Sequence, residues 1–180
     1  MSFYGIEELL TKLEGVRVNS CSKITHEKLL QLVNLSQKPL QLPGLKLSAH
    51  PLSYLDLRHA NMRGCDFSQC VMIEINLESA MLISCNFNDV NLKNSNLRNT
   101  IVSHSSFVGA SLYGVQMFRT VAKDCNFKKA RLIRADLREG DFSNGDFSEA
   151  SLVDANLERA CFNGARMQTS NLDGANVSNT

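Results

Sequence analysis

The sequence predicts an all-β solenoid, a chain wound into stacked square coils, and three observations carry this prediction. From Leu52 to Val177 every fifth residue is apolar, which makes 26 positions without an insertion in a chain whose hydrophobic content is 43%. The residue two positions before each of these centres is usually small, and the residue directly before it is Asp or Asn in 14 of the 26 places. Phenylalanines also recur every twenty residues. We call the position directly before each centre the slot.

A strict period of five indicates a chain that bends at regular intervals. An α-helix repeats its faces every 3.6 residues and a strand every two, so neither explains this pattern. Asn and Asp adopt turn dihedrals readily and hydrogen-bond to their own backbone, which suits a bend in every five-residue segment. Four such segments would close one coil, in agreement with the spacing of the phenylalanines.

The period of twenty predicts two columns of side chains inside the coils. The aromatic column contains Phe67, Phe87, Phe107, Phe127 and Phe147 and continues with Met167. The small column beside it contains Cys65, Cys85, Ser105, Cys125, Gly145 and Ala165. Coils about 4.8 Å apart would stack each ring on the next, and about 6.5 coils predict a rod roughly 31 Å long.

The first fifty residues do not follow the period of five. Apolar residues at helical spacing from Phe3 to Leu13 predict one helix, and a second is expected from Thr25 until Pro39 and the Pro43–Gly44 pair. A terminal coil exposes its core, so we expect these helices to form a small N-terminal α-helical cap. The predicted division is therefore residues 1–46, cap and lead-in, and residues 47–180, the solenoid.

The A-[DN]-[LF] triplets at Ala135–Leu137, Ala155–Leu157 and Ala175–Val177 resemble the pentapeptide-repeat family over about 130 of the 180 residues. The resemblance implies a right-handed quadrilateral parallel β-helix. The square coil follows from the period, whereas the handedness comes from the resemblance alone.

The opening segment FYGIEEL is similar to the last helix of BTB domains in the potassium-channel-tetramerisation-domain (KCTD) group. Residues 24–27 and 55–58 resemble the linker and first coil of a KCTD-type protein that carries pentapeptide repeats. This second resemblance implies the substrate-recognition module of a cullin ubiquitin-ligase adaptor. The BTB body of about 100 residues is missing from the sequence, so a fragment and a protein without its cullin-binding half both stay open.

Composition narrows the class of protein. The net charge of +1, from 19 basic and 18 acidic residues, favours neither general nucleic-acid binding nor a DNA mimic. No run of 18 apolar residues predicts a membrane span, and the N-terminus does not resemble a secretory signal. Six cysteines in this setting are expected to be reduced thiols. We expect a cytoplasmic protein, with the nucleus as the alternative.

Residues arranged for catalysis or metal binding are not evident in the sequence. The four histidines fall in different columns and no cysteine pair has metal-ligand spacing, so no catalytic, cofactor or metal site is predicted. The column cysteines are expected to be core fillers. Cys161 occupies a slot, points outward in the predicted coil and is the candidate for a reactive thiol.

One face of the predicted solenoid replaces Asp and Asn with apolar residues. Met81, Ile101 and Val121 occupy consecutive slots twenty residues apart, and Ile83 and Phe118 lie beside them. Arg98, Arg119 and Lys123 would form the rim. Exposed apolar patches with polar rims are typical of protein-binding sites, so these eight residues are the predicted partner site.

Three further surfaces are weaker candidates. A basic belt contains Arg119, Lys123, Lys128, Lys129, Arg131, Arg134 and Arg138. A column of Tyr113, Ile133 and Val153 lies on another face, and the last coil would expose Leu172 and Val177, which a homodimer would cover. The predicted function is thus a non-catalytic protein-interaction scaffold, with a protein that mimics DNA and binds a topoisomerase, an effector, or a purely structural solenoid as alternatives.

Overall fold

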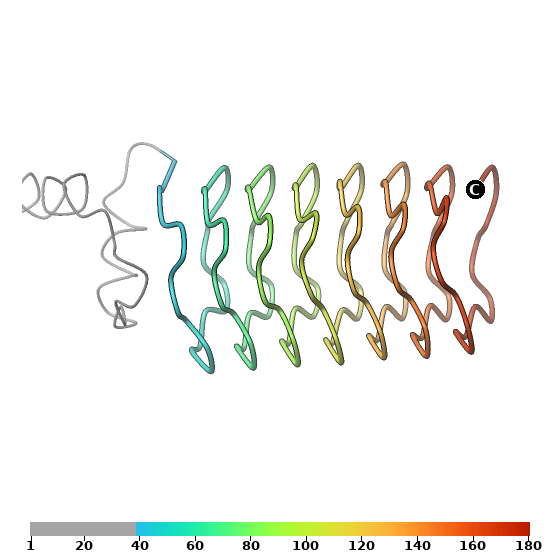
Figure 1. The fold of residues 1–180 in the computed structure, drawn as a ribbon, viewed down its shortest axis with the longest axis horizontal. Coiled ribbons are helices and arrows are strands. Elements are labelled where there is room, and N and C mark those ends of the chain that lie inside the picture. Colours follow the sequence, from blue (N-terminus) through green and yellow to red (C-terminus); the bar gives the residue numbers. More distant parts are fainter. Residues whose placement is uncertain (1–38) are drawn as a thin grey trace, which may run out of the picture.

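Residues 39–180 form a rod of stacked coils, which are the part of the chain that the computed structural model describes (Figure 1). The described residues contain no helix, and each strand is a single bridged residue. Parallel bridges run from Gln41↔Asn61 to Asn156↔Asn176, and each joins two residues that are twenty apart. This confirms the β-solenoid and its coil of twenty residues. The helices predicted within residues 1–38 lie outside the described residues.

Each coil has four faces of five residues, and the apolar centre of each face points inward. Face 1 has centres from Leu42 to Phe162, face 2 from Leu47 to Met167, face 3 from Leu52 to Leu172, and face 4 from Leu57 to Val177. The coils begin before the predicted boundary at residue 47. Leu42 is already a buried centre, so the Pro43–Gly44 pair is a corner of the first coil, not the end of a helix.

The backbone hydrogen bonds run parallel to the rod axis and join neighbouring coils. The N–H of Met81 donates to the carbonyl of Ala60 in the preceding coil at 2.8 Å. The N–H of Leu82 donates to the carbonyl of Ile101 in the following coil, also at 2.8 Å. Because the same pattern recurs on all faces, the side walls of the rod have their bridging backbone groups paired along the axis.

The corners are made by residues in the left-handed conformation. From Gly44 to Asn179 every corner has a positive φ two residues after the centre, and only six of these residues are glycine. The others have φ between 54° and 65°, a region that costs roughly 1–2 kcal/mol for an ordinary L-residue. A backbone bond across each turn, such as Ala60 N–H to the Leu57 carbonyl at 3.2 Å, helps to hold this conformation.

Asp and Asn in the slots do not themselves provide the left-handed residue. Their Oδ1 atoms instead accept a bond from the N–H two residues later, as Asp146 does from Ser148 at 2.9 Å. Thirteen of the 14 Asp and Asn slot residues make this bond. The predicted backbone bonding is confirmed, but the turn dihedral belongs to the residue three positions further along the chain.

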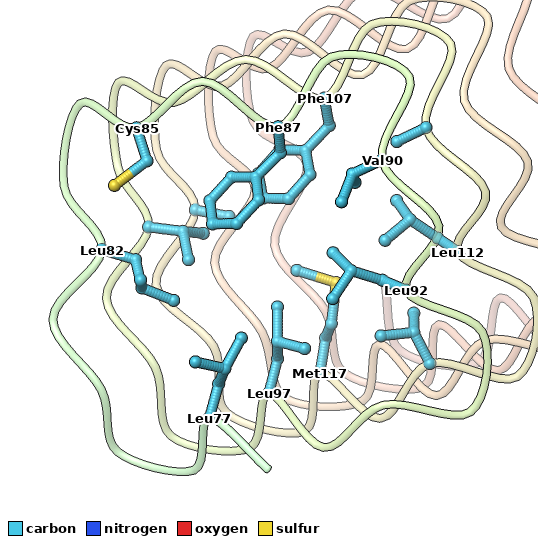
Figure 2. Close-up of a cluster of buried hydrophobic side chains, with 14 of the residues drawn as sticks. Leu77, Leu82, Cys85, Phe87, Val90, Leu92, Leu97, Phe107, Leu112 and Met117 are labelled. Carbon is cyan, nitrogen blue, oxygen red and sulfur yellow. The ribbon is translucent and has the colours of Figure 1, made fainter. Parts of the chain in front are cut away.

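The aromatic column forms as predicted and is the axis of the core. Phe67, Phe87, Phe107, Phe127 and Phe147 are fully buried. Their ring centroids are 4.7–4.9 Å apart, and the rings are nearly parallel. Figure 2, which looks along the rod, shows Phe87 lying over Phe107 while leucines from the other faces fill the space between the walls. The interior of the coils is therefore packed with side chains.

A second aromatic stack was not predicted. Phe142 and Phe162, consecutive centres of face 1, stack at 5.2 Å, and Phe142 meets the ring of Phe127 edge-on at 6.1 Å. The aromatic core is therefore wider in the C-terminal coils than in the middle of the rod.

Candidate functional site

The predicted patch lies on face 1 as one continuous column. Met81 bridges Ile101, and Ile101 bridges Val121, so the three slot side chains follow one another along the rod axis. Ile101 is 37% exposed, and Met81 and Val121 are half-buried. Ile83 lies two residues beyond Met81 on the same face and is also half-buried. These four residues, Met81, Ile83, Ile101 and Val121, are called the face 1 patch below.

Phe118 does not belong to the apolar surface itself. It lies on face 4, across the corner from Val121, and guanidinium groups cover its ring: Arg119 is 4.8 Å and Arg138 5.6 Å from the ring centroid. The prediction that Phe118 extends the patch is therefore changed, because its ring forms part of a cationic rim. Sequence spacing alone does not reveal where a long arginine side chain lies.

The three predicted rim cations differ in what they contact. Arg119 pairs with Glu139 at 2.8 Å, and Lys123 pairs with Asp141 at 3.0 Å. Arg98 is exposed and takes part in no ion pair within residues 39–180. Arg98 is thus the cation of this rim that is free to meet an acidic group of another molecule.

The basic belt is largely neutralised by acidic residues, most of them in the next coil. Six of its seven side chains form ion pairs, and Arg131 is the exception among the described residues. Several pairs join residues twenty apart, as in Arg134 with Asp154 at 3.7 Å. Exposed pairs of this kind contribute about 0–1 kcal/mol each and support the register of the coils. An acidic partner for the belt therefore has little free charge to meet.

Face 3 carries two other apolar groups. Tyr113, Ile133 and Val153 follow one another as predicted, but Lys93 lies 5.6 Å from the Tyr113 ring and Arg134 donates to its hydroxyl at 3.1 Å. The sequence analysis missed a second group near the start of the rod, where Pro51 bridges Val71 and the N–H of Tyr54 donates to the carbonyl of Ile73. Tyr54 is 72% exposed, and its place at a corner of the column pattern was the available signal.

The column cysteines are core residues, as predicted. Burial raises the pKa of Cys65 and Cys70 to about 11, and that of Cys85 and Cys125 to about 12. Each of these four thiols donates to a carbonyl of the preceding coil, at 2.8–3.1 Å. Cys161 is only half-buried, and its Sγ lies 3.3 Å from the hydroxyl of Ser143.

We expect alkylation of the folded protein to separate these thiols. The thiolate is the reactive form, so the raised pKa values and the burial should slow modification of the four core cysteines about 100-fold or more relative to Cys161. Labelling with iodoacetamide at pH 7.5, followed by peptide mass spectrometry, measures this difference. Labelling in denaturant is the control, in which all should react at similar rates. Equal labelling in the folded state would contradict the prediction.

The remaining titratable groups offer little for chemistry. Within residues 39–180 no cluster of three His, Cys, Asp or Glu side chains is placed to hold a metal ion. His104 lies 3.7 Å from Asp124 on an exposed corner, and His50 bonds to the carbonyl of Leu47 at 2.9 Å. The described part of the chain also contains no helix with the length and hydrophobicity of a membrane span. His26 lies outside the described residues.

The last coil, residues 161–180, leaves part of its core uncovered. Leu172 is 36% exposed and Val177 is 54% exposed, in agreement with the prediction. Phe162 and Met167 are only partly buried against the preceding coil. This end of the rod is a further apolar surface.

Comparison with protein-family models decides the family. The model described as "Pentapeptide repeats" matches in eight copies at residues 52–89, 60–99, 85–121, 116–152 and 150–180, which together cover more than half of the chain. The chain belongs to the pentapeptide-repeat family. A comparison with curated protein sequences finds no match.

Solved structures of other pentapeptide-repeat proteins share this fold. The trypsin-treated QnrB1, described as a plasmid-mediated fluoroquinolone resistance protein, superposes with a TM-score of 0.51 at 20% identity over 76% of this chain and 71% of that one. HetL from the cyanobacterium Nostoc sp. strain PCC 7120 has 18% identity and a TM-score of 0.31 over 86% of this chain and 97% of its own. Rfr23 from the cyanobacterium Cyanothece 51142 has 18% identity and a TM-score of 0.37 over 82% and 99%.

The predicted link to BTB proteins gains no support from these comparisons. The pentapeptide-repeat match begins at residue 52, after the FYGIEEL segment on which the link mainly rests. That segment also lies outside the described residues. The pentapeptide-repeat assignment thus stands without the finer role that the BTB resemblance implied.

Proposed function

We propose that this pentapeptide-repeat solenoid is a non-catalytic scaffold that binds a partner protein through the face 1 patch. The observation that carries the proposal is a continuous row of exposed apolar side chains, Met81, Ile101 and Val121, in slots that elsewhere mostly hold Asp or Asn. Such a row gains from being covered, because water is released from its apolar surface. The packed interior of the coils supports the non-catalytic part of the proposal, since it provides no lumen for a substrate.

A rigid wall makes this patch suitable for recognition. Its three slot residues sit on backbone that is hydrogen-bonded to the coils on both sides, so little conformational entropy is lost when a partner binds. Substitution of the slots should therefore change the surface without changing the coil, because most slots hold small polar residues.

We expect the triple variant Met81→Asn, Ile101→Asn, Val121→Asn to fold normally and to lose its partner. The control is Ser111→Asn with Arg131→Asn, two slots on face 3 of the same coils. Affinity capture from lysate is followed by binding measurements with the purified partner, whose dissociation constant should rise at least tenfold for the triple variant only. Equal binding by all three proteins would refute the proposal.

A second candidate function is suggested by the fold shared with QnrB1, namely binding to a topoisomerase as a mimic of DNA. Residues 47–180 contain 13 basic and 14 acidic residues, and many of them pair across coils, so the surface lacks the dense negative charge of DNA. A supercoiling assay with DNA gyrase tests this candidate: protection of the enzyme from a fluoroquinolone would favour it. Recovery of cullin ligase components in the capture experiment would instead favour the BTB-type adaptor.

We also propose that a second copy of the chain covers the exposed core of the last coil. Leu172 and Val177 are the apolar residues that such a contact would bury. Sedimentation velocity should give the mass of a dimer for the wild type and that of a monomer for Leu172→Asp with Val177→Asp. A monomeric wild type would exclude this arrangement.

A further inference from the structure

We infer that the partner held by the face 1 patch presents an amphipathic α-helix, aligned with the rod axis and acidic along its flanks. This inference rests on the proposed function, since it names the kind of partner that the same surface fits. Three features of the patch carry it: the state of its backbone groups, the spacing of its side chains and the charges that remain unpaired around it.

The backbone of the patch has no free hydrogen-bonding groups to offer a partner. The carbonyls of Met81, Ile101 and Val121 accept from the N–H groups of Met62, Leu82 and Val102 at 2.8–2.9 Å. The N–H groups of the same three residues donate to the preceding coil at 2.8–3.1 Å. An extended segment lying on this wall could not add to the sheet, and its own backbone groups facing the patch would lose water without gaining a bond. A helix satisfies its backbone internally and avoids this loss.

The spacing of the patch also matches a helix better than a strand. Bridged coils are about 4.8 Å apart, so Met81 and Val121 are separated by about 10 Å along the axis. A helix returns to the same side about every 5.4 Å, and its residues i, i+4 and i+7 span about 10.5 Å. Side chains on one side of a strand are about 6.7 Å apart, so three of them span about 13 Å and fall out of step with the column.

The unpaired charges around the patch are positive. Arg63 lies one coil before Ile83 in the same column, and Arg98 lies three residues before Ile101, across the corner on face 4. Both are exposed, and neither takes part in an ion pair within residues 39–180. Glu78, the acid one coil before Arg98, lies 3.4 Å from the Nδ2 of Asn96.

The other charges beside the patch neutralise one another. Arg119 pairs with Glu139, and Lys123 pairs with Asp141. His104 lies against Asp124 at the next corner. The two free arginines therefore set the sign of the surface, and carboxylates on the flanks of a docked helix would complement them.

Synthetic peptides test the inference directly. The acidic-flank peptide has about 20 residues, leucines at i, i+4 and i+7, and glutamates on both flanks; its helix is fixed by a hydrocarbon staple because short helices are marginal in water. The basic-flank peptide has lysine in place of glutamate. The strand-pattern peptide has the composition of the first, without the staple, but alternates leucine with polar residues. Fluorescence anisotropy measures the affinity of each for the whole chain.

We expect the acidic-flank peptide to bind at least tenfold more tightly than either of the others. Met81→Asn, Ile101→Asn, Val121→Asn should weaken this binding at least tenfold, whereas Ser111→Asn with Arg131→Asn should not. Arg63→Glu with Arg98→Glu should reverse the order of the two helical peptides. Circular dichroism of every variant confirms that the coils are intact.

Other rankings overturn the inference. Tighter binding of the strand-pattern peptide, an unchanged order after the two arginine substitutions, or no binding of the acidic-flank peptide up to about 1 mM would each do so. The proposed function fails separately, when the captured partner binds the triple asparagine variant as well as the wild type. A partner that depends on the patch while the peptides rank differently would remove only the helix.

Discussion

Replacing Phe107 with alanine is expected to lower the free energy of unfolding by about 3–5 kcal/mol, the range measured for buried phenylalanines. The ring is fully buried, and its centroid lies 4.7 Å from that of Phe87 and 4.8 Å from that of Phe127. Truncation would therefore remove two stacking contacts and leave a cavity in the middle of the rod. The surrounding walls are tied to their neighbours by axial hydrogen bonds, so they have little freedom to collapse into it.

Phe118 provides the matched control, because it belongs to the next face-4 segment but lies outside the coil. Its ring contacts Arg119 and Arg138 and is only half-buried. Phe118→Ala should cost about 1 kcal/mol. Equilibrium unfolding in guanidinium chloride, followed by circular dichroism, gives both values. Similar losses for the two variants would mean that the aromatic column does not carry the stability assigned to it.

The second large effect is expected on face 1, where the size of a centre is matched by the residue two positions before it. A Cβ on Gly140 would lie 2.5 Å from Cε2 of Phe142 and 3.1 Å from the carbonyl oxygen of Leu137. In the preceding coil the same two positions hold Thr120 and Ala122, so a larger residue accompanies a smaller centre. Gly140→Thr alone should destabilise the protein by about 1–3 kcal/mol through overpacking.

A double-mutant cycle tests this size matching. Phe142→Ala alone should cost about 3–5 kcal/mol, since it leaves a cavity beside Phe127, Phe147 and Phe162. Gly140→Thr combined with Phe142→Ala reproduces the Thr120–Ala122 pair and should cost less than the sum of the single changes by about 0.5–3 kcal/mol. Strict additivity of the two losses would show that the two positions do not share one space.

Much of this architecture could be predicted because the pattern of five is written in the inward residues themselves. The period locates each centre, and the period of twenty locates the columns, so the stack from Phe67 to Phe147 and the row from Met81 to Val121 follow directly. The same rule pairs Arg119 with Glu139 and Arg134 with Asp154, which are twenty residues apart. It also includes Leu42, whose burial shows that the coils start earlier than predicted.

Other features have no counterpart in residue type. The left-handed corners include His59, Arg119 and Glu139, which by themselves do not favour a positive φ. Their conformation is imposed by the bonds between coils and not by local preference. The position of the Arg138 guanidinium over Phe118 depends on side-chain rotamers, so spacing could not reveal it. The occupant of the face 1 patch is encoded in another molecule, and only its shape and charge can be inferred here.

The twenty-residue repeat of the bridges has a consequence for insertions and deletions. Removing residues 111–115 would leave every remaining centre pointing inward, yet it would turn the rest of the rod by a quarter. Val121 would then follow Asn96 on face 4, and the row that begins at Met81 would end at Ile101. Removing a full twenty residues would only shorten the rod, so its outer surfaces tolerate changes of length in whole turns and are scrambled by anything less.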